Sequence, residues 1–152
     1  MPLNDYKQKR NLKKSGEPKP KPKIKKISGK KLTYVIHEHF ASHHHYDLRL
    51  EMNGILKSWA VPKSPPIEDK TKRLAIQVED HPLNYAKFQG IISEGNYGAG
   101  KVKIWDKGNY ELIEKTPKKI EIDIKGKKLK GKYVLVKTNY GGKKDNWLFM
   151  KV

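Results

Sequence analysis

The amino-acid sequence predicts an all-β fold, either a barrel or a sandwich built from short strands. From Leu32 onward, apolar and polar residues alternate with a period of two, which is typical of strands with one buried face. Gly, Asn and Pro residues separate the alternating runs, as turns require. No apolar pattern with a helical period extends far enough for a long helix, so strands must supply the core.

The first three strands are predicted at residues 33–39, 45–52 and 55–61. In the second run, "HYDLRLEM", apolar residues occupy the even positions, whereas His, Asp, Arg and Glu occupy the odd positions. The two sets must therefore point to opposite faces of the sheet. Asn53-Gly54 follows, and both residues tolerate the positive φ of a type I′ turn, so the third strand should return antiparallel.

Six further strands are predicted, which brings the total to nine. In the run from Arg73 to His81, we expect Leu74, Ile76 and Val78 to face inward and Glu79 to share the outward face with Arg73. Residues 81–88, "HPLNYAKF", predict one short helical turn. The six strands are expected at residues 73–81, 100–106, 109–114, 119–126, 131–138 and 146–152.

Length and charge indicate one domain with a polyanionic partner. A chain of 152 residues is most simply a single domain, and its formal charge of +18 points to nucleic acid before an anionic membrane. Residues 1–31 form a basic, Lys/Pro-rich arm that supplies +10 of this charge, whereas residues 32–152 form the folded domain. The sequence contains no apolar run suited to a signal peptide or membrane span, so we expect a soluble, cytoplasmic protein.

A histidine-rich segment, "HEHFASHHHYDLRLE" at residues 37–51, suggests a metal site. His45 and Asp47 share one strand face, and His39 can approach from the preceding strand to complete a group of two imidazoles and one carboxylate. The chain has no cysteine, so any metal must bind to His, Asp or Glu. In a strand, His37 would lie on the same face as His39, and His43 on the same face as His45. Spacing alone therefore does not identify which histidines bind the metal. The alternative is a chance run of histidines on a solvated strand.

The chain resembles a known enzyme family. The run "HEHFASHHHYDLRLEMNGILKSWAVPKSPP" and the later run "DKTKRLAIQVEDHPLNYAKFQGIISEGNYGAGKVKIWDKGNY" are similar to the 3′-phosphoesterase domain found at the N-terminus of bacterial DNA ligase D and as free-standing proteins. The resemblance extends over residues 6–112. It implies a compact, single-domain β-barrel of about eight or nine short strands with minor helical turns. The active site is then expected on one barrel face.

The resemblance also implies an activity and a metal. The expected enzyme is a free-standing, Mn²⁺-dependent phosphoesterase that removes 3′-phosphates or 3′-terminal ribonucleotides from DNA or RNA ends during strand-break repair, leaving a 3′-hydroxyl. Zn²⁺ or Co²⁺ are alternative ions. The substrates would be primer-template or duplex 3′ ends, and a separate DNA ligase and end-joining proteins would be partners. The implied metal ligands are His39, His45 and Asp47.

Further residues match the active-site motifs of this family. His81 is the best candidate for a general acid or phosphate donor, and Glu79 could orient the guanidinium of Arg73. His37, His43 and His44 depart from the family pattern, so we expect His43 and His44 at the surface or the substrate rim. The residues expected to act in catalysis or to contact phosphate are His81, Arg49, Lys63, Arg73, Glu79 and Tyr85.

The N-terminal arm carries a weaker part of the resemblance. Arg10 and Glu17 match expected substrate-binding positions, whereas Asn11 stands where the family has aspartate, so a charge is lost there. Part of residues 6–18 could pack on the active site. The alternative function is a noncatalytic barrel that binds single-stranded nucleic acid through stacking aromatic residues. Its candidate stacking residues are Trp59, Tyr97, Trp105 and Tyr110.

Overall fold

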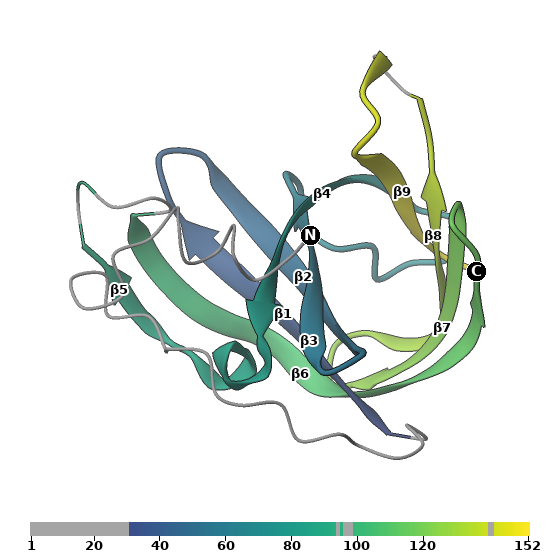
Figure 1. Cartoon of the computed structure of the whole chain (residues 1–152), viewed down its shortest axis with the longest axis horizontal. Helices are drawn as coiled ribbons and strands as arrows, with labels where there is room; N and C mark the ends of the chain where they lie inside the picture. The colour runs from purple at the N-terminus through teal and green to yellow at the C-terminus, as the bar shows by residue number, and fades with distance from the viewer. Residues whose placement is uncertain (1–30, 94, 96–98, 140–141) are drawn as a thin grey trace.

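The structure, a computed structural model, describes residues 31–93, 95, 99–139 and 142–152. These residues form a closed antiparallel barrel of eight strands with one additional strand, which confirms the predicted all-β barrel (Figure 1). The strands are β1 (Leu32–Phe40), β2 (His44–Met52), β3 (Ile55–Val61), β4 (Lys72–Pro82), β5 (Gly90–Ile92), β6 (Gly100–Lys115), β7 (Lys119–Gly126), β8 (Lys130–Lys137) and β9 (Asn146–Lys151). A 3₁₀ helix, η1 (Leu83–Lys87), follows β4.

The barrel closes through one pairing between distant segments. The strand order is β1-β2-β3-β4-β9-β8-β7-β6, and β6 pairs with β1 to complete the ring, while β5 pairs with β6 outside it. Closure satisfies the hydrogen-bonding groups that edge strands would leave open. At the β2–β3 hairpin, Asn53 and Gly54 have φ values of 53° and 80°, as the predicted type I′ turn requires.

One hydrophobic core fills the barrel and receives side chains from all eight of its strands. On β2, Leu48, Leu50 and Met52 point into this core and are buried. Alternation then directs the odd-numbered residues of β2 to the other side of the sheet. The largest fully buried side chain in the core is Trp59, which contacts Trp147 in an edge-on arrangement with ring centroids 6.0 Å apart.

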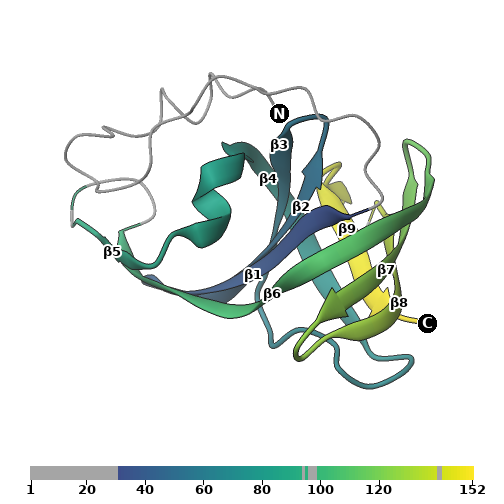
Figure 2. The same ribbon diagram turned by 90° about the horizontal axis from the view of Figure 1, so that it is seen from below.

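A second, smaller cluster covers the outer face of β1 to β4. Leu56 and Tyr85 are buried there and pack against Leu83 and Phe88, at the two ends of η1. Figure 2 shows η1 and β5 on one side of β1 and β2, with β7, β8 and β9 on the other. The predicted helical turn is thus confirmed as the five-residue η1. Within the described ranges, no helix has the length and apolar character needed to cross a membrane.

The strand boundaries differ from the prediction around residue 108. Residues 100–106 and 109–114 were predicted as two strands separated by Lys107-Gly108, but β6 continues through both. Gly108 is required by close approach rather than by a turn, because a Cβ at this position would collide with the carbonyl oxygen of Lys125 on β7. The sequence prediction also missed β5, whose three residues are too few for a periodic pattern.

The predicted inward face of β4 is wrong. Ala75, rather than Leu74 or Ile76, is fully buried in the barrel core, and Leu74 and Ile76 are half-buried. The alternation of apolar residues in this strand therefore does not identify its core side. The small Ala75 side chain fits against Trp147, its cross-strand partner on β9.

Candidate active site

A pocket of about 300 Å³ lies on the outer face of β1 to β4, opposite the barrel core. It contains seven of the residues that the sequence identified, and all seven are buried apart from the half-buried His45. These residues are His39, His45, Asp47, Arg49, Glu79, His81 and Tyr85. The structure therefore brings together residues from β1, β2, β4 and η1.

Strand register places the first residues of this group side by side. His39 on β1 lies directly opposite His45 on β2, and His37 lies opposite Asp47. On the other side of β2, Arg49 pairs with Ser58 of β3. Since directly opposed residues on one sheet face have neighbouring side chains, the pairing itself assembles the site.

His39, His45 and Asp47 form a group that could hold a metal ion. One candidate ligand atom from each residue lies within 4.8 Å of the others. The Nδ1 of His39 is 3.7 Å from Asp47 Oδ2, and the Nε2 of His45 is 3.3 Å from Asp47 Oδ1. Two imidazoles with one carboxylate are a donor set typical of Mn, Fe or Zn sites.

The tautomer of His45 fits this role. Its Nδ1–H donates a hydrogen bond of 2.9 Å to the carbonyl oxygen of His43, which directs Nε2 toward Asp47. A neutral Nε2 and a carboxylate oxygen are both acceptors, so a proton or a cation must lie between them. Without metal, burial opposes protonation of His45, but the hydrogen bond and charge of Asp47 outweigh it and raise the pKa of His45.

Asp47 is ionised although it is buried. Burial alone would raise the pKa of this carboxyl, but the charge of Arg49 and hydrogen bonds from His39 and His45 hold it well below its usual value. The Nη2 of Arg49 lies 3.4 Å from Asp47 Oδ2. Asp47 therefore offers a permanent negative charge to a metal ion at neutral pH.

Arg49 lies at the centre of a buried hydrogen-bond network. Only 3% of this residue is exposed. Its Nε–H donates to Nδ1 of His37 over 3.0 Å, and its Nη1 donates to Oγ of Ser58 over 2.9 Å. The guanidinium also lies 4.8 Å from the centre of the Tyr85 ring. Contacts in several directions hold the cation in one orientation beside Asp47.

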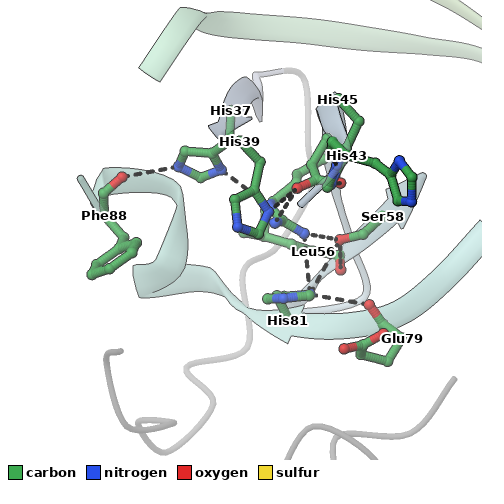
Figure 3. Close-up of polar contacts among 11 residues, drawn as sticks. His37, His39, His43, His45, Leu56, Ser58, Glu79, His81 and Phe88 are labelled. Atoms are coloured by element: carbon green, nitrogen blue, oxygen red, sulfur yellow. Dashed lines mark hydrogen bonds and ion pairs between the residues drawn. The ribbon is translucent and has the colours of Figure 1, made fainter. Parts of the chain in front are cut away.

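His37 is a site residue whose role the sequence did not reveal. Figure 3 shows its ring between Phe88 and the rest of the site. Its Nε2–H donates to the carbonyl oxygen of Phe88 over 3.0 Å, so Nδ1 is the acceptor for Arg49. Burial and the neighbouring charge of Arg49 lower the pKa of His37 to about 3, so the ring is neutral. The shared strand parity of His37 and His39 indicated that both side chains lie on one face of the sheet. It did not indicate that His37 would hold Arg49.

His81 and Tyr85 form the opposite wall of the pocket. The Nδ1–H of His81 donates to the carbonyl oxygen of Glu79 over 3.0 Å, and the same nitrogen lies 3.2 Å from Nη1 of Arg49 (Figure 3). The rings of His81 and Tyr85 have centroids 4.7 Å apart. Ser58, which sequence reasoning did not identify, lies 3.4 Å from His81 Nδ1.

A bulge in β4 determines where Glu79 and His81 point. Ser58 pairs with Val78 and Leu56 pairs with His81, so Glu79 and Asp80 together oppose Lys57. The additional residue shifts the alternation, and both Glu79 and His81 reach the pocket. The expectation that Glu79 shares a strand face with Arg73 is therefore wrong.

Two predicted phosphate-contacting residues do not line this pocket. Arg73 lies near the start of β4, where its Nε–H donates to the carbonyl oxygen of Ser64 over 2.7 Å. Lys63 is exposed on the segment that follows β3. Three predicted substrate-binding residues lie outside the described part of the chain: Arg10, Asn11 and Glu17.

The fold and the pocket define a class of protein: a β-barrel with a metal-ligand group and a buried cation on one face. Comparison with known sequences gives the family. Residues 37–137 match the DNA Ligase D 3′-phosphoesterase domain, and the chain belongs to this family. The match confirms the resemblance found in the sequence and supports a hydrolase acting on nucleic acid ends.

The curated relatives are longer proteins. The chain is 44% identical to the multifunctional non-homologous end joining protein LigD of Pseudomonas aeruginosa, over 99% of this chain and 18% of the relative. It is 44% identical to LigD of Mycobacterium bovis over 96% of this chain and 19% of that relative, and 41% identical to LigD of Mycolicibacterium smegmatis over 96% and 20%. The chain thus spans about a fifth of the length of these relatives.

Proposed function

We propose that the chain is a divalent-metal-dependent 3′-phosphoesterase that removes 3′-phosphates or 3′-terminal ribonucleotides from nucleic acid ends and leaves a 3′-hydroxyl. The observation that carries this proposal is the His39, His45 and Asp47 group beside buried Arg49. Three protein ligands leave coordination positions for substrate, as a catalytic metal site needs. The donor set favours Mn²⁺, with Zn²⁺ and Co²⁺ as alternatives.

The protein's own residues would orient the phosphate and its charge. A bound divalent ion would help to neutralise the negative charge that develops on the phosphoryl group. Arg49, held in place by His37 and Ser58, presents a fixed positive charge beside the same location. Such preorganisation requires no reorientation of the cation during the reaction.

His81 is the residue that we propose to move a proton. Its ring is fixed through Nδ1, which donates to the carbonyl oxygen of Glu79, and it lines the pocket together with Asp47. An imidazole can donate a proton to a leaving oxygen near neutral pH. Tyr85, in contact with both His81 and Arg49, would bind a phosphate oxygen or pack against the terminal sugar.

The biological setting is also proposed from the relatives. Their printed name, non-homologous end joining protein, supports substrates that are primer-template or duplex 3′ ends at strand breaks. A separate DNA ligase would then seal the 3′-hydroxyl product, and end-joining proteins would hold the ends.

A direct test uses a labelled primer-template that ends in either a 3′-phosphate or a 3′-terminal ribonucleotide. We expect conversion to a 3′-hydroxyl end with Mn²⁺ and none in excess chelator. His45→Ala and Asp47→Ala should abolish turnover, whereas His43→Ala should retain it, because the exposed His43 contributes its backbone carbonyl. Full turnover in chelator, or in either ligand variant, would contradict the proposed metal site.

The noncatalytic binding function receives less support from the structure. Trp59 and Tyr110, two of its four candidate stacking residues, are buried in the barrel core and cannot stack on bases. Trp105 is half-buried, and Tyr97 lies outside the described residues. A catalytic role accounts for the buried imidazole and carboxylate group, which simple binding does not require.

A further inference from the structure

A row of aromatic rings occupies the sheet face opposite the metal-ligand group. Phe40 stacks on His44 with ring centroids 4.9 Å apart and an angle of 22° between the rings. His44 meets Tyr46 edge-on at 5.2 Å, and Tyr46 meets Trp105 edge-on at 5.8 Å. We call Phe40, His44, Tyr46 and Trp105 the aromatic row. It connects β1, β2 and β6, which lie side by side in Figure 1.

One end of the aromatic row is open to solvent. Phe40 is 41% exposed, and the side chain of His44 is 47% exposed. At the other end, Tyr46 and Trp105 are half-buried and pack against the barrel core. The exposed rings therefore pack against rings that the barrel core holds in place. This packing limits the conformational entropy that the exposed rings would lose on binding a flat ligand.

Basic residues surround the row. Lys101 pairs with Phe40 across β1 and β6, and the Nζ of Lys128 lies 4.4 Å from the centre of the Trp105 ring. Lys103 pairs with Glu38, the carboxylate on this part of the face. Glu38 is already engaged, because His44 Nε2 lies 2.8 Å from its Oε2. Aromatic faces with lysine beside them are suited to nucleotides, which combine flat bases with phosphate charge.

The row lies close to the pocket but on the other side of the sheet. Along β2, His44 and Tyr46 alternate with His45 and Asp47, so successive side chains serve opposite faces. The two faces meet at the turn between β1 and β2, where Ala41 lines the pocket. A strand whose 3′ end lies in the pocket reaches the row by passing around this turn.

We infer that the aromatic row is a second nucleic-acid contact, which stacks bases of the strand whose 3′ end is bound in the pocket wherever those bases are unpaired. The inference rests on the proposed function for the identity of that 3′ end. Base stacking explains why Phe40 and His44 are both exposed. The neighbouring lysines attract the phosphates of the nucleic-acid backbone, whatever its sequence. The aromatic row therefore increases the affinity for longer nucleic-acid strands, whereas the residues of the pocket carry out the reaction.

The test compares strands of different length in Phe40→Ala. A 3′-phosphorylated strand of about 12 nucleotides can reach the row, whereas a 3′-phosphorylated dinucleotide cannot. Phe40→Ala should raise KM for the long strand, relative to KM for the dinucleotide, by about 5- to 150-fold, the loss expected for one stacked base. Phe40→Tyr should retain the parent ratio. Ile113→Ala, which removes a comparably exposed side chain far along β6, is the matched control.

Binding measured without turnover separates this inference from the proposed function. Fluorescence anisotropy of an unphosphorylated strand in excess chelator should show the same loss for Phe40→Ala, even if no substrate is hydrolysed. An equal effect of Phe40→Ala on both lengths, or no effect on either, would overturn the inference. The inference would also be overturned if Phe40→Ala lost binding to phosphatidylserine vesicles but still bound the nucleic-acid strand like the parent. That result would indicate that the aromatic row binds a membrane surface.

Discussion

Replacing His37 with leucine should disable Arg49 while leaving the metal ligands in place. In the structure, His37 accepts a hydrogen bond from Nε of Arg49 and donates one to the carbonyl oxygen of Phe88, each over 3.0 Å. Leucine can make neither bond. A hydrogen bond to a charged group contributes about 1.5–3 kcal/mol, and its loss leaves a buried charged donor unsatisfied.

The size of the effect on the reaction follows from this energy. If the whole loss falls on the transition state, kcat should decrease by about 10- to 150-fold, because each factor of ten corresponds to about 1.4 kcal/mol. His37→Gln offers a carbonyl oxygen to Arg49 and an amide N–H to Phe88, so it should restore most of the rate. His43→Ala, at an exposed side chain nearby, should match the parent.

The measurements are kcat and KM on a 3′-phosphate strand, metal affinity by titration, and urea unfolding. A purely structural role for His37 would lower the unfolding free energy without a selective change in kcat of the folded protein. If His37 positions Arg49, kcat should decrease in His37→Leu and recover in His37→Gln. The metal affinity of both variants should stay near that of the parent. The reasoning is refuted if His37→Leu keeps its kcat, or if glutamine is as damaging as leucine.

Three further predictions concern the barrel and the arm. Asp106 accepts three backbone N–H bonds from residues 127–129 and the hydroxyl of Tyr34, so Asp106→Ala should reduce the free energy of unfolding by about 3 kcal/mol or more, measured by urea denaturation, with kcat at saturation retained in the folded fraction. Deleting residues 19–31 should flatten the salt dependence of strand binding, because fewer counterions are released, with little change in single-turnover rate at saturation. Asn11→Asp should raise the rate by up to about tenfold if a charge-assisted bond is restored there, and equal kinetics in Asn11→Asp and Asn11→Ala would remove position 11 from the site.

The sequence alone determined the local β structure. Period-two alternation identified the strands at residues 45–52 and 55–61, and Asn53-Gly54 identified the turn between them. Such features depend on neighbours within a few residues, so a linear pattern contains them. Where glycine served another purpose, the same reasoning failed: Gly108 was interpreted as a turn, but it accommodates the backbone of β7.

The sequence also supplied the metal-ligand candidates, but not the choice among the histidines. Alternation placed His45 with Asp47, and the family resemblance selected His39 rather than His37. The structure gives the physical distinction. His39 lies opposite His45 in the β1–β2 register, whereas His37 lies one pleat further along and turns its ring toward Arg49 and Phe88.

Only the tertiary structure determined which polar residues are buried and what they contact. A period of two separates the faces of β2, but it does not show that η1 and its cluster cover the polar face and bury Arg49. His81 reaches Arg49 because β4 pairs with β3 through a bulge, across 32 residues of sequence. Local periodicity records which side a residue faces, whereas its partners depend on strands that meet only when the chain folds, and this information is absent from any short segment.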